Sequence, residues 1–211
     1  MTAPVEWNYD PQELRADGLV HVISVTFAAI GAAAVVVLAL RAAPSMLFGV
    51  GVYAICLVVT LTISALYNMW PVGPRKWLLR RLDHAGIFLL IAGTYTPFAL
   101  QFDAFGRNFM IGVWCFATLG MLYKIALPGR FDKFAVLVYL GLGWSGLFLF
   151  RQMTLDLAPL AVTLILFGGL VYSSGVVFHL KGSLRFQNAI WHAFVLAGAA
   201  CHYAAVLVTI F

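Results

Sequence analysis

Charged residues are scarce in this chain. Asp, Glu, Lys and Arg make up 10% of its 211 residues, whereas an ordinary soluble domain carries about 25%. Hydrophobic residues make up 63% of the chain, and the mean hydropathy is +0.96. This composition excludes a water-soluble globular domain, and we expect an integral membrane protein.

Cysteine is also rare, and lysine is missing from the last apolar run. Cys56, Cys115 and Cys201 stand alone inside apolar runs, which excludes a disulfide framework and a cysteine-rich zinc site. The lysines all lie in or beside the predicted loops. A retinal pump, whose Schiff base needs a lysine on its last helix, is therefore disfavoured.

The first residues lack the basic region of a signal peptide. Before the first apolar run, Glu6, Asp10, Glu13 and Asp17 stand against the single Arg15. We therefore expect the first run to remain as a helix. The interpretation is a cytoplasmic tail over residues 1–18 and one transmembrane domain over residues 19–211.

Seven apolar runs have the length of a transmembrane helix. In hydrocarbon every backbone polar group must be satisfied within its own segment, so runs of about 17 to 25 residues predict helices rather than strands. The fold class is thus all-α, a seven-transmembrane helix bundle. The predicted spans cover residues 19–40, 46–69, 83–101, 108–127, 133–150, 157–178 and 189–210.

The basic residues predict the orientation of the bundle. Most of the 13 Lys and Arg residues lie in the tail and in the loops after spans two, four and six. Only Arg41, Arg107 and Arg151 fall on the opposite side. Since cytoplasmic loops hold the excess of Lys and Arg, the N-terminus is expected in the cytoplasm and the C-terminus outside. The net charge of +5 then needs no nucleic acid to explain it.

Polar residues within the spans gather on the cytoplasmic side. They are His21, Ser64, Asn68, Asp83, His84 and His192. A single such residue near a helix end is often only hydrogen-bonded or reaches the interface. Six on one face of the membrane instead favour a shared polar site, because ionisable groups within a span are costly and are candidates for function. His202 is too far along its helix to join them, and we expect it to pack between helices.

Span five contains a cluster of small residues. Gly141, Gly143 and Gly146 lie on either side of Ser145. Small residues let helices approach closely in lipid. The pattern therefore predicts a close helix contact along span five.

Four motifs stand out: SALYN at residues 64–68, RLDHAGIF at 81–88, AGTYTPF at 92–98 and NAIWHAFV at 188–195. They resemble those of the hemolysin III proteins, the bacterial branch of the progestin and adipoQ receptor family. The resemblance covers essentially the whole chain. It implies a bacterial inner (cytoplasmic) membrane protein with seven spans. It also implies a zinc hydrolase or receptor, with zinc bound by a histidine of span two and a His-x3-His pair of span seven.

Two of the ligand positions that the resemblance implies do not carry histidine. Ser64, Asp83 and His192 match the family's serine, aspartate and second histidine, but Asn68 and Asn188 stand where zinc ligands are expected. An amide oxygen is a poor replacement for imidazole at zinc. We therefore expect little or no metal at this set, with Ser64 and Asp83 as the candidate catalytic residues and His21 and His84 beside them in the pocket. A different metal set built from His21, Asp83, His84 and His192 stays open.

Three functions are consistent with the sequence. The first is a hemolysin III-like membrane protein that keeps the polar pocket without zinc and binds or regulates rather than catalyses. The second is an active metal-dependent hydrolase of a lipid amide or ester. The third is an ion or proton transporter, because buried Asp and His can form relays, although we find no internal repeat. Membrane lipid is the expected partner, as surroundings and as substrate or ligand.

Overall fold

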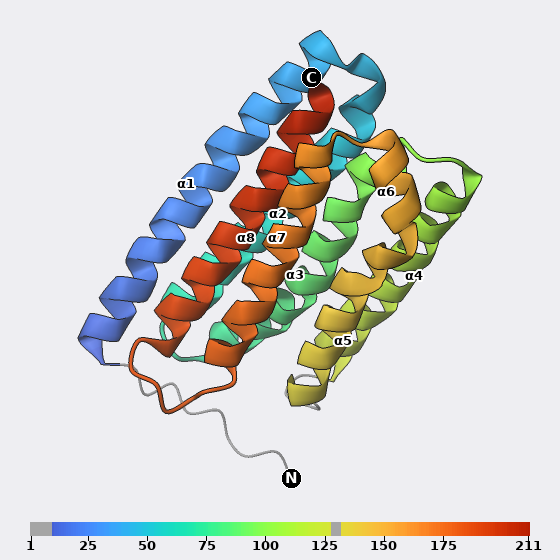
Figure 1. The fold of residues 1–211 in the computed structure, drawn as a ribbon. Coiled ribbons are helices and arrows are strands. Elements are labelled where there is room, and N and C mark those ends of the chain that lie inside the picture. Colours follow the sequence, from blue (N-terminus) through green and yellow to red (C-terminus); the bar gives the residue numbers. More distant parts are fainter. Residues whose placement is uncertain (1–9, 128–131) are drawn as a thin grey trace.

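The computed structural model describes residues 10–127 and 132–211, and these residues form an all-helical bundle (Figure 1). The α-helices are α1 (Pro11–Ala42), α2 (Leu47–Met69), α3 (Pro74–Ala99), α4 (Ala104–Ala126), α5 (Asp132–Trp144), α6 (Phe150–Asp156), α7 (Pro159–His179) and α8 (Gln187–Ile210). Two 3₁₀ segments, η1 (Pro44–Met46) and η2 (Ser145–Leu149), join α1 to α2 and α5 to α6.

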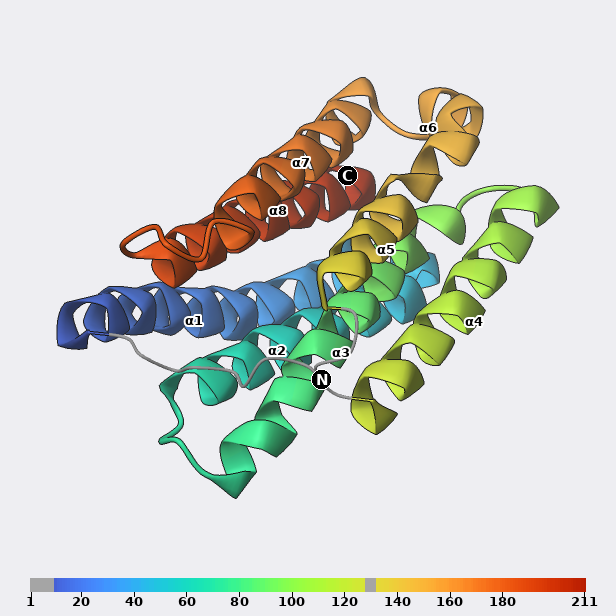
Figure 2. The ribbon, with the colours of Figure 1, turned by 90° about the horizontal axis from the view of Figure 1, so that it is seen from below.

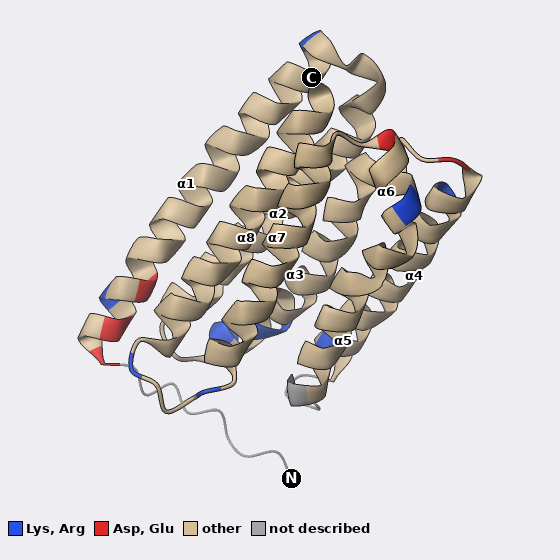
Figure 3. Ribbon diagram, viewed as in Figure 1, with Lys and Arg blue, Asp and Glu red and all other residues tan. Residues whose placement is uncertain are grey.

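The bundle has the features of an integral membrane protein. Six helical segments are long and apolar enough to cross a bilayer: Pro11–Ala42, Pro44–Met69, Ala104–Ala126, Phe134–Asp156, Pro159–His179 and Gln187–Ile210. Helix α3 is not among the six, and its first half carries Lys76, Arg80 and Asp83. Figure 3 shows that charged residues lie mainly at the two ends of the bundle. We call the end where α1, α3 and α8 begin the N-terminal end.

Several predicted boundaries need correction. Helix α1 begins at Pro11 rather than near residue 19, so part of the predicted tail is helical. Helix α3 begins at Pro74, so the basic segment before residue 83 is helical rather than a loop. Residues 1–9 and 128–131, including Glu6 and Arg130, lie outside the described residues.

The fifth predicted span is not the continuous helix expected over residues 133–150. It changes to 3₁₀ geometry at Ser145 and continues as α6 to Asp156. The Tyr95 hydroxyl of α3 lies at this break, where it donates toward the Gly143 carbonyl (2.6 Å) and accepts from the Gly146 N–H (2.6 Å). Gly141 and Gly143 face open space rather than a neighbouring helix. The predicted close contact is therefore confined to Gly146.

Small residues allow the closest helix pairs to pack. A Cβ added to Gly93 of α3 would lie 2.5 Å from the Cβ of Cys56 in α2. Between α7 and α8, a Cβ on Gly168 would lie 2.6 Å from the His202 ring. Such approach is characteristic of helices in lipid, where van der Waals packing rather than hydrophobic burial holds helices together.

Two apolar cores hold the bundle together. The larger core joins α1, α2, α3, α7 and α8, with Leu149 and Met153 from η2 and α6. The smaller core joins α3, α4 and α5 around Phe88, Val113 and Leu142. Figure 2 shows the helices from one end, with α7 and α8 on one side and α4 on another. Between these groups lies the cavity described below.

Candidate functional site

A capping box fixes the start of α1. The Asp10 carboxylate accepts hydrogen bonds from the backbone N–H groups of Gln12 (2.6 Å) and Glu13 (2.9 Å), and the Glu13 carboxylate accepts from the Asp10 N–H (3.1 Å). The Glu13 N–H thereby lowers the pKa of the Asp10 carboxyl below its usual value. Because the helix starts here, Asp17 and His21 lie one turn apart on the same face of α1.

The connection between α7 and α8 is held against this start of α1. The Phe186 N–H donates to the Glu13 carboxylate (2.8 Å), and the Arg185 guanidinium donates to the Gln12 side-chain oxygen (2.6 Å). Arg185 also lies 3.5 Å from the Asp10 carboxylate. These contacts place the first turns of α8 beside α1, so a histidine in those turns can reach Asp17.

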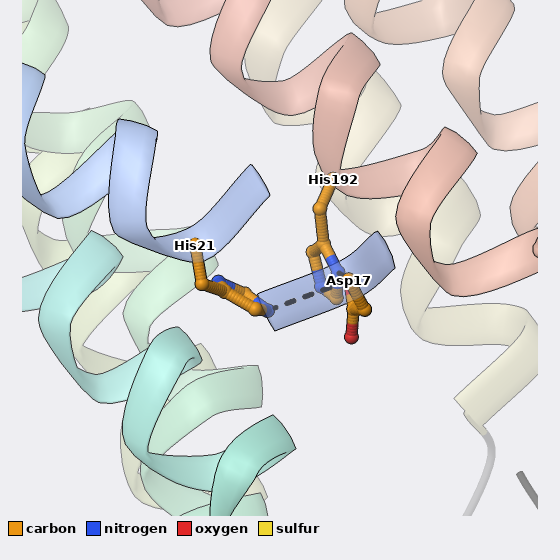
Figure 4. A group of neighbouring side chains, drawn as sticks. All are labelled: Asp17, His21 and His192. Carbon is orange, nitrogen blue, oxygen red and sulfur yellow. Dashed lines mark hydrogen bonds and ion pairs between the residues drawn. The ribbon is translucent and has the colours of Figure 1, made fainter. Parts of the chain in front are cut away.

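Asp17, His21 and His192 meet in a buried cluster (Figure 4). The Nδ1 of His192 lies 2.6 Å from the Oδ1 of Asp17, and the Nε2 of His21 lies 3.6 Å from the same oxygen. The two imidazole rings are 4.3 Å apart between centroids. All three residues are buried, with exposed fractions of 4%, 3% and 8%. The His21 Nε2 has no hydrogen-bond partner among the described residues.

Asp83 and Ser64 form a second polar group nearby. Asp83, Ser64 and His192 line the same cavity. Its Oδ2 also lies 3.4 Å from the Nδ1 of His84. The His84 ring packs edge-on against Tyr67. The predicted residues Ser64, Asp83 and His192 are thus close together.

An apolar cavity of about 240 Å³ extends from these groups into the bundle. His21, Ser64, Asp83 and His192 line one end of it. Along α3 its lining extends from Asp83 past Leu90 to Ala99, and Phe102 beyond the end of α3 and Met153 of α6 line the far part. The helical stretch from Asp83 to Ala99 alone is about 24 Å long at 1.5 Å per residue. The cavity is therefore long, narrow and polar at the N-terminal end.

Asn68 and Asn188 lie in a separate hollow. Both line it together with Asp17, Glu13 and Gln187. The Asn68 amide donates to the Ser64 carbonyl (2.9 Å), as a polar residue at a helix end commonly does. Asp17 lines this hollow but not the apolar cavity, whereas His21 and His192 line the cavity. The cluster thus separates the two spaces.

The remaining histidines have different surroundings. His202 lies against the Ile165 carbonyl (Nε2 to O, 3.1 Å) and the Tyr172 ring of α7, which confirms the prediction that it packs between helices. His179 packs against Trp191 and lines the cavity.

Asp17 is the site residue that the sequence analysis missed. It was assigned to the tail, because the first span was expected to begin at residue 19. The available signal was its spacing of four residues before His21, together with the Asp10 and Glu13 pattern of a capping box. With Asp17 included, the cluster offers two imidazole nitrogens and one carboxylate oxygen, and such a group could hold a metal ion.

The known proteins that this chain resembles agree with the family whose sequence profile it matches. The sequence profile described as "Haemolysin-III related" matches residues 13–203. The chain is 34% identical to the "Hemolysin-3 homolog" of Bacillus subtilis (strain 168) over 163 residues, which is 76% of this chain and 74% of that protein. It is 40% identical to "Hemolysin-3" of Bacillus cereus over 128 residues, covering 60% of this chain and 58% of that protein. The human "Monocyte to macrophage differentiation factor" is 27% identical over 165 residues, covering 76% and 67%.

Proposed function

This chain belongs to the haemolysin III-related family, as its motifs indicated, and we propose that it binds a single-chain membrane lipid. The head of the lipid lies at the polar end of the cavity, near His21, Asp83 and His192, and its tail lies along α3. The polar end of a largely apolar cavity is the observation that carries this proposal.

The shape of the cavity favours one acyl chain. Its volume of about 240 Å³ is just below the range of about 300 to 1,000 Å³ typical of small-molecule sites, while its lining extends over most of α3. A tail that leaves the bilayer for this cavity exchanges one apolar environment for another and gains little hydrophobic free energy. The polar head must therefore supply most of the affinity and the selectivity.

The positions at which the family resemblance implies zinc do not fit the metal. Asn68 and Asn188 offer neutral amides, and the Asn68 amide already donates a hydrogen bond to the Ser64 carbonyl. Zinc sites use imidazole, thiolate or carboxylate ligands. We therefore propose that this ligand set holds no zinc, and that lipid binding or regulation rather than catalysis is the main activity.

Hydrolysis of a lipid amide or ester is the second candidate function. It is favoured by Asp83, which lies beside Ser64 and near His192 at the head of the cavity. Asp83 could accept a proton from an attacking water, and the Ser64 hydroxyl could hold the Asp83 carboxylate in place. A metal bound at the cluster would supply polarisation of the carbonyl.

The family and the basic residues also support a proposal about where the protein lies in the cell. We propose that the protein lies in a bacterial cytoplasmic membrane, with the N-terminal end of the bundle in the cytoplasm. The basic residues at that end support this orientation.

Neighbouring valines of α7 provide a matched test of lipid binding. Val176 lines the cavity, whereas Val177 is 51% exposed on the outer face. Val176→Trp places an indole ring where the lipid tail would lie, so we expect the affinity for lipid to fall by roughly tenfold or more, which is about 1.4 kcal/mol or more. Val177→Trp should have no effect. Native mass spectrometry of the detergent-purified protein, titrated with a long-chain fatty acid and with an N-acyl amide, measures both. Equal lipid binding by the two variants would refute the proposal.

A further inference from the structure

We infer that Asp17, His21 and His192 form a divalent metal site of the zinc class, with ligands that differ from those expected at positions 68 and 188. This inference goes beyond lipid binding and does not depend on it. It starts from the donor set. One ligand atom from each residue lies within 4.8 Å of the others. Two imidazoles and one carboxylate are a ligand set of catalytic zinc sites, which leave a fourth position open.

The unpartnered nitrogen of His21 supports a missing ligand. The His21 side chain is almost completely buried, and its Nε2 has no hydrogen-bond partner among the residues that the structure describes. A buried polar atom without a partner costs free energy. This nitrogen points at the Asp17 carboxylate at 3.6 Å, too far for a hydrogen bond, and an ion between them would satisfy both.

The charges around the cluster also suit a divalent ion. Asp17 is buried, and His192 interacts electrostatically with both Asp17 and Asp83. A buried carboxylate needs a positive partner. Asp17 and Asp83 together balance the two charges of Zn²⁺, and the buried Lys76, which interacts electrostatically with Asp17, adds one further positive charge nearby. Protonation of His21 and His192 would balance the same charges, so the experiment must separate metal from protons.

The distances require only local adjustment. A tetrahedral ion with ligand bonds of about 2.0 to 2.2 Å holds its ligand atoms about 3.3 to 3.6 Å apart. The 2.6 Å contact between Asp17 and His192 must open slightly, or the second Asp17 oxygen must take its place.

The first experiment measures zinc directly. The protein is purified in detergent without chelator, its metal content per chain is determined by elemental mass spectrometry, and the stripped protein is titrated with Zn²⁺ by calorimetry. We expect one high-affinity site per chain. The variants Asp17→Asn, His21→Gln and His192→Gln should each weaken Zn²⁺ binding by more than the roughly 10- to 100-fold that loss of an outer-shell partner costs. The matched controls Asn68→Ala and Asn188→Ala should bind as the unmodified protein does.

A second set of variants guards against loss of fold. Asp17→Asn is nearly isosteric, and elution on size exclusion with an unchanged circular dichroism spectrum identifies variants that remain folded. In the Asp17→Asn background, the pair Asn68→His and Asn188→His should restore Zn²⁺ binding with His192, while either change alone should restore much less. Restored Zn²⁺ binding would show that the Asp17→Asn protein is folded and lacks only a metal ligand.

The outcomes are distinct. No Zn²⁺ binding by the unmodified protein would overturn the inference and leave a proton-sharing cluster of Asp17, His21 and His192. Unchanged binding in the Asp17, His21 and His192 variants, or loss of binding in the Asn68 and Asn188 controls, would also overturn it by locating the metal elsewhere. Because no lipid is present in the titration, a failure here leaves the lipid-binding proposal standing.

Discussion

The carboxylate of Glu13 joins two segments that are far apart in sequence. One oxygen accepts from the Asp10 N–H at the start of α1, and the other accepts from the Phe186 N–H before α8. Phe186 has a left-handed backbone (φ 59°), which costs a non-glycine residue free energy and needs surrounding contacts to persist. Glu13 thus helps to hold His192 beside Asp17.

Removal of this carboxylate should therefore destabilise the bundle. Hydrogen bonds to a charged acceptor are worth about 1.5 to 3 kcal/mol each. Glu13 is partly exposed, so we expect Glu13→Ala to cost about 1 to 3 kcal/mol in total. Thermal unfolding in detergent measures the change. Arg15→Ala, at an exposed position of the same turn, is the control and should have little effect. Equal midpoints for the two variants would contradict this role of Glu13.

At the scale of residues, the sequence predicted part of the site. His21 and His192 were expected on one side of the membrane, and they lie 4.3 Å apart between ring centroids. Asp17 was missed because hydropathy places the start of a span where apolar residues begin. The capping box starts the helix earlier. The contact of Asp17 with His192 depends on tertiary packing between α1 and α8, which a local pattern does not encode.

At the scale of elements, apolar run length predicted the helices well and their irregularities poorly. The break at Ser145 depends on the Tyr95 hydroxyl of α3, which bonds to the backbone around it. This contact joins residues about fifty positions apart, so the glycines of the segment were interpreted as a packing surface. Hydropathy reports where a helix can lie in lipid, but not which side chain of another helix reorganises its backbone.

Helix α3 decides the topology of the chain. It does not qualify as a span by length and composition, but it lies within the bundle beside α2 and α4 (Figures 1 and 2). If α3 crosses the bilayer, the chain makes seven crossings, and its two termini lie on opposite sides. The polar Asp83 can be tolerated there because it faces the cavity rather than lipid.

Reporter fusions at the C-terminus test this topology. Alkaline phosphatase is active only outside the cytoplasm, whereas green fluorescent protein exported through the same general pathway does not fluoresce there. With an N-terminus in the cytoplasm and seven crossings, we expect an active phosphatase fusion and a dark fluorescent fusion after Phe211. The opposite pair of signals would place the C-terminus in the cytoplasm and would contradict this topology.

At the scale of the whole molecule, charge and apolar surface are arranged for a bilayer. Charged groups lie mainly at the two ends (Figure 3). Many large apolar side chains are exposed on the outer face, among them Phe48, Leu119, Phe148 and Leu170, as expected where lipid is the solvent. Composition alone predicted this much. The cavity could not be predicted, because its walls come from α3, the broken fifth segment, α7 and α8 together.

Photo-crosslinking with single-chain lipids tests whether a lipid lies in the cavity with its head at the polar end. Two fatty-acid probes carry a diazirine either next to the carboxyl group or at the last carbon of the tail. We expect the first probe to label residues near the cluster, such as Trp191, and the second to label the far part of the cavity, such as Phe102 or Met153. Val176→Trp should suppress both labels. Labelling of the outer face by both probes, at residues such as Leu119 and regardless of the diazirine position, would contradict a lipid held in the cavity by its head.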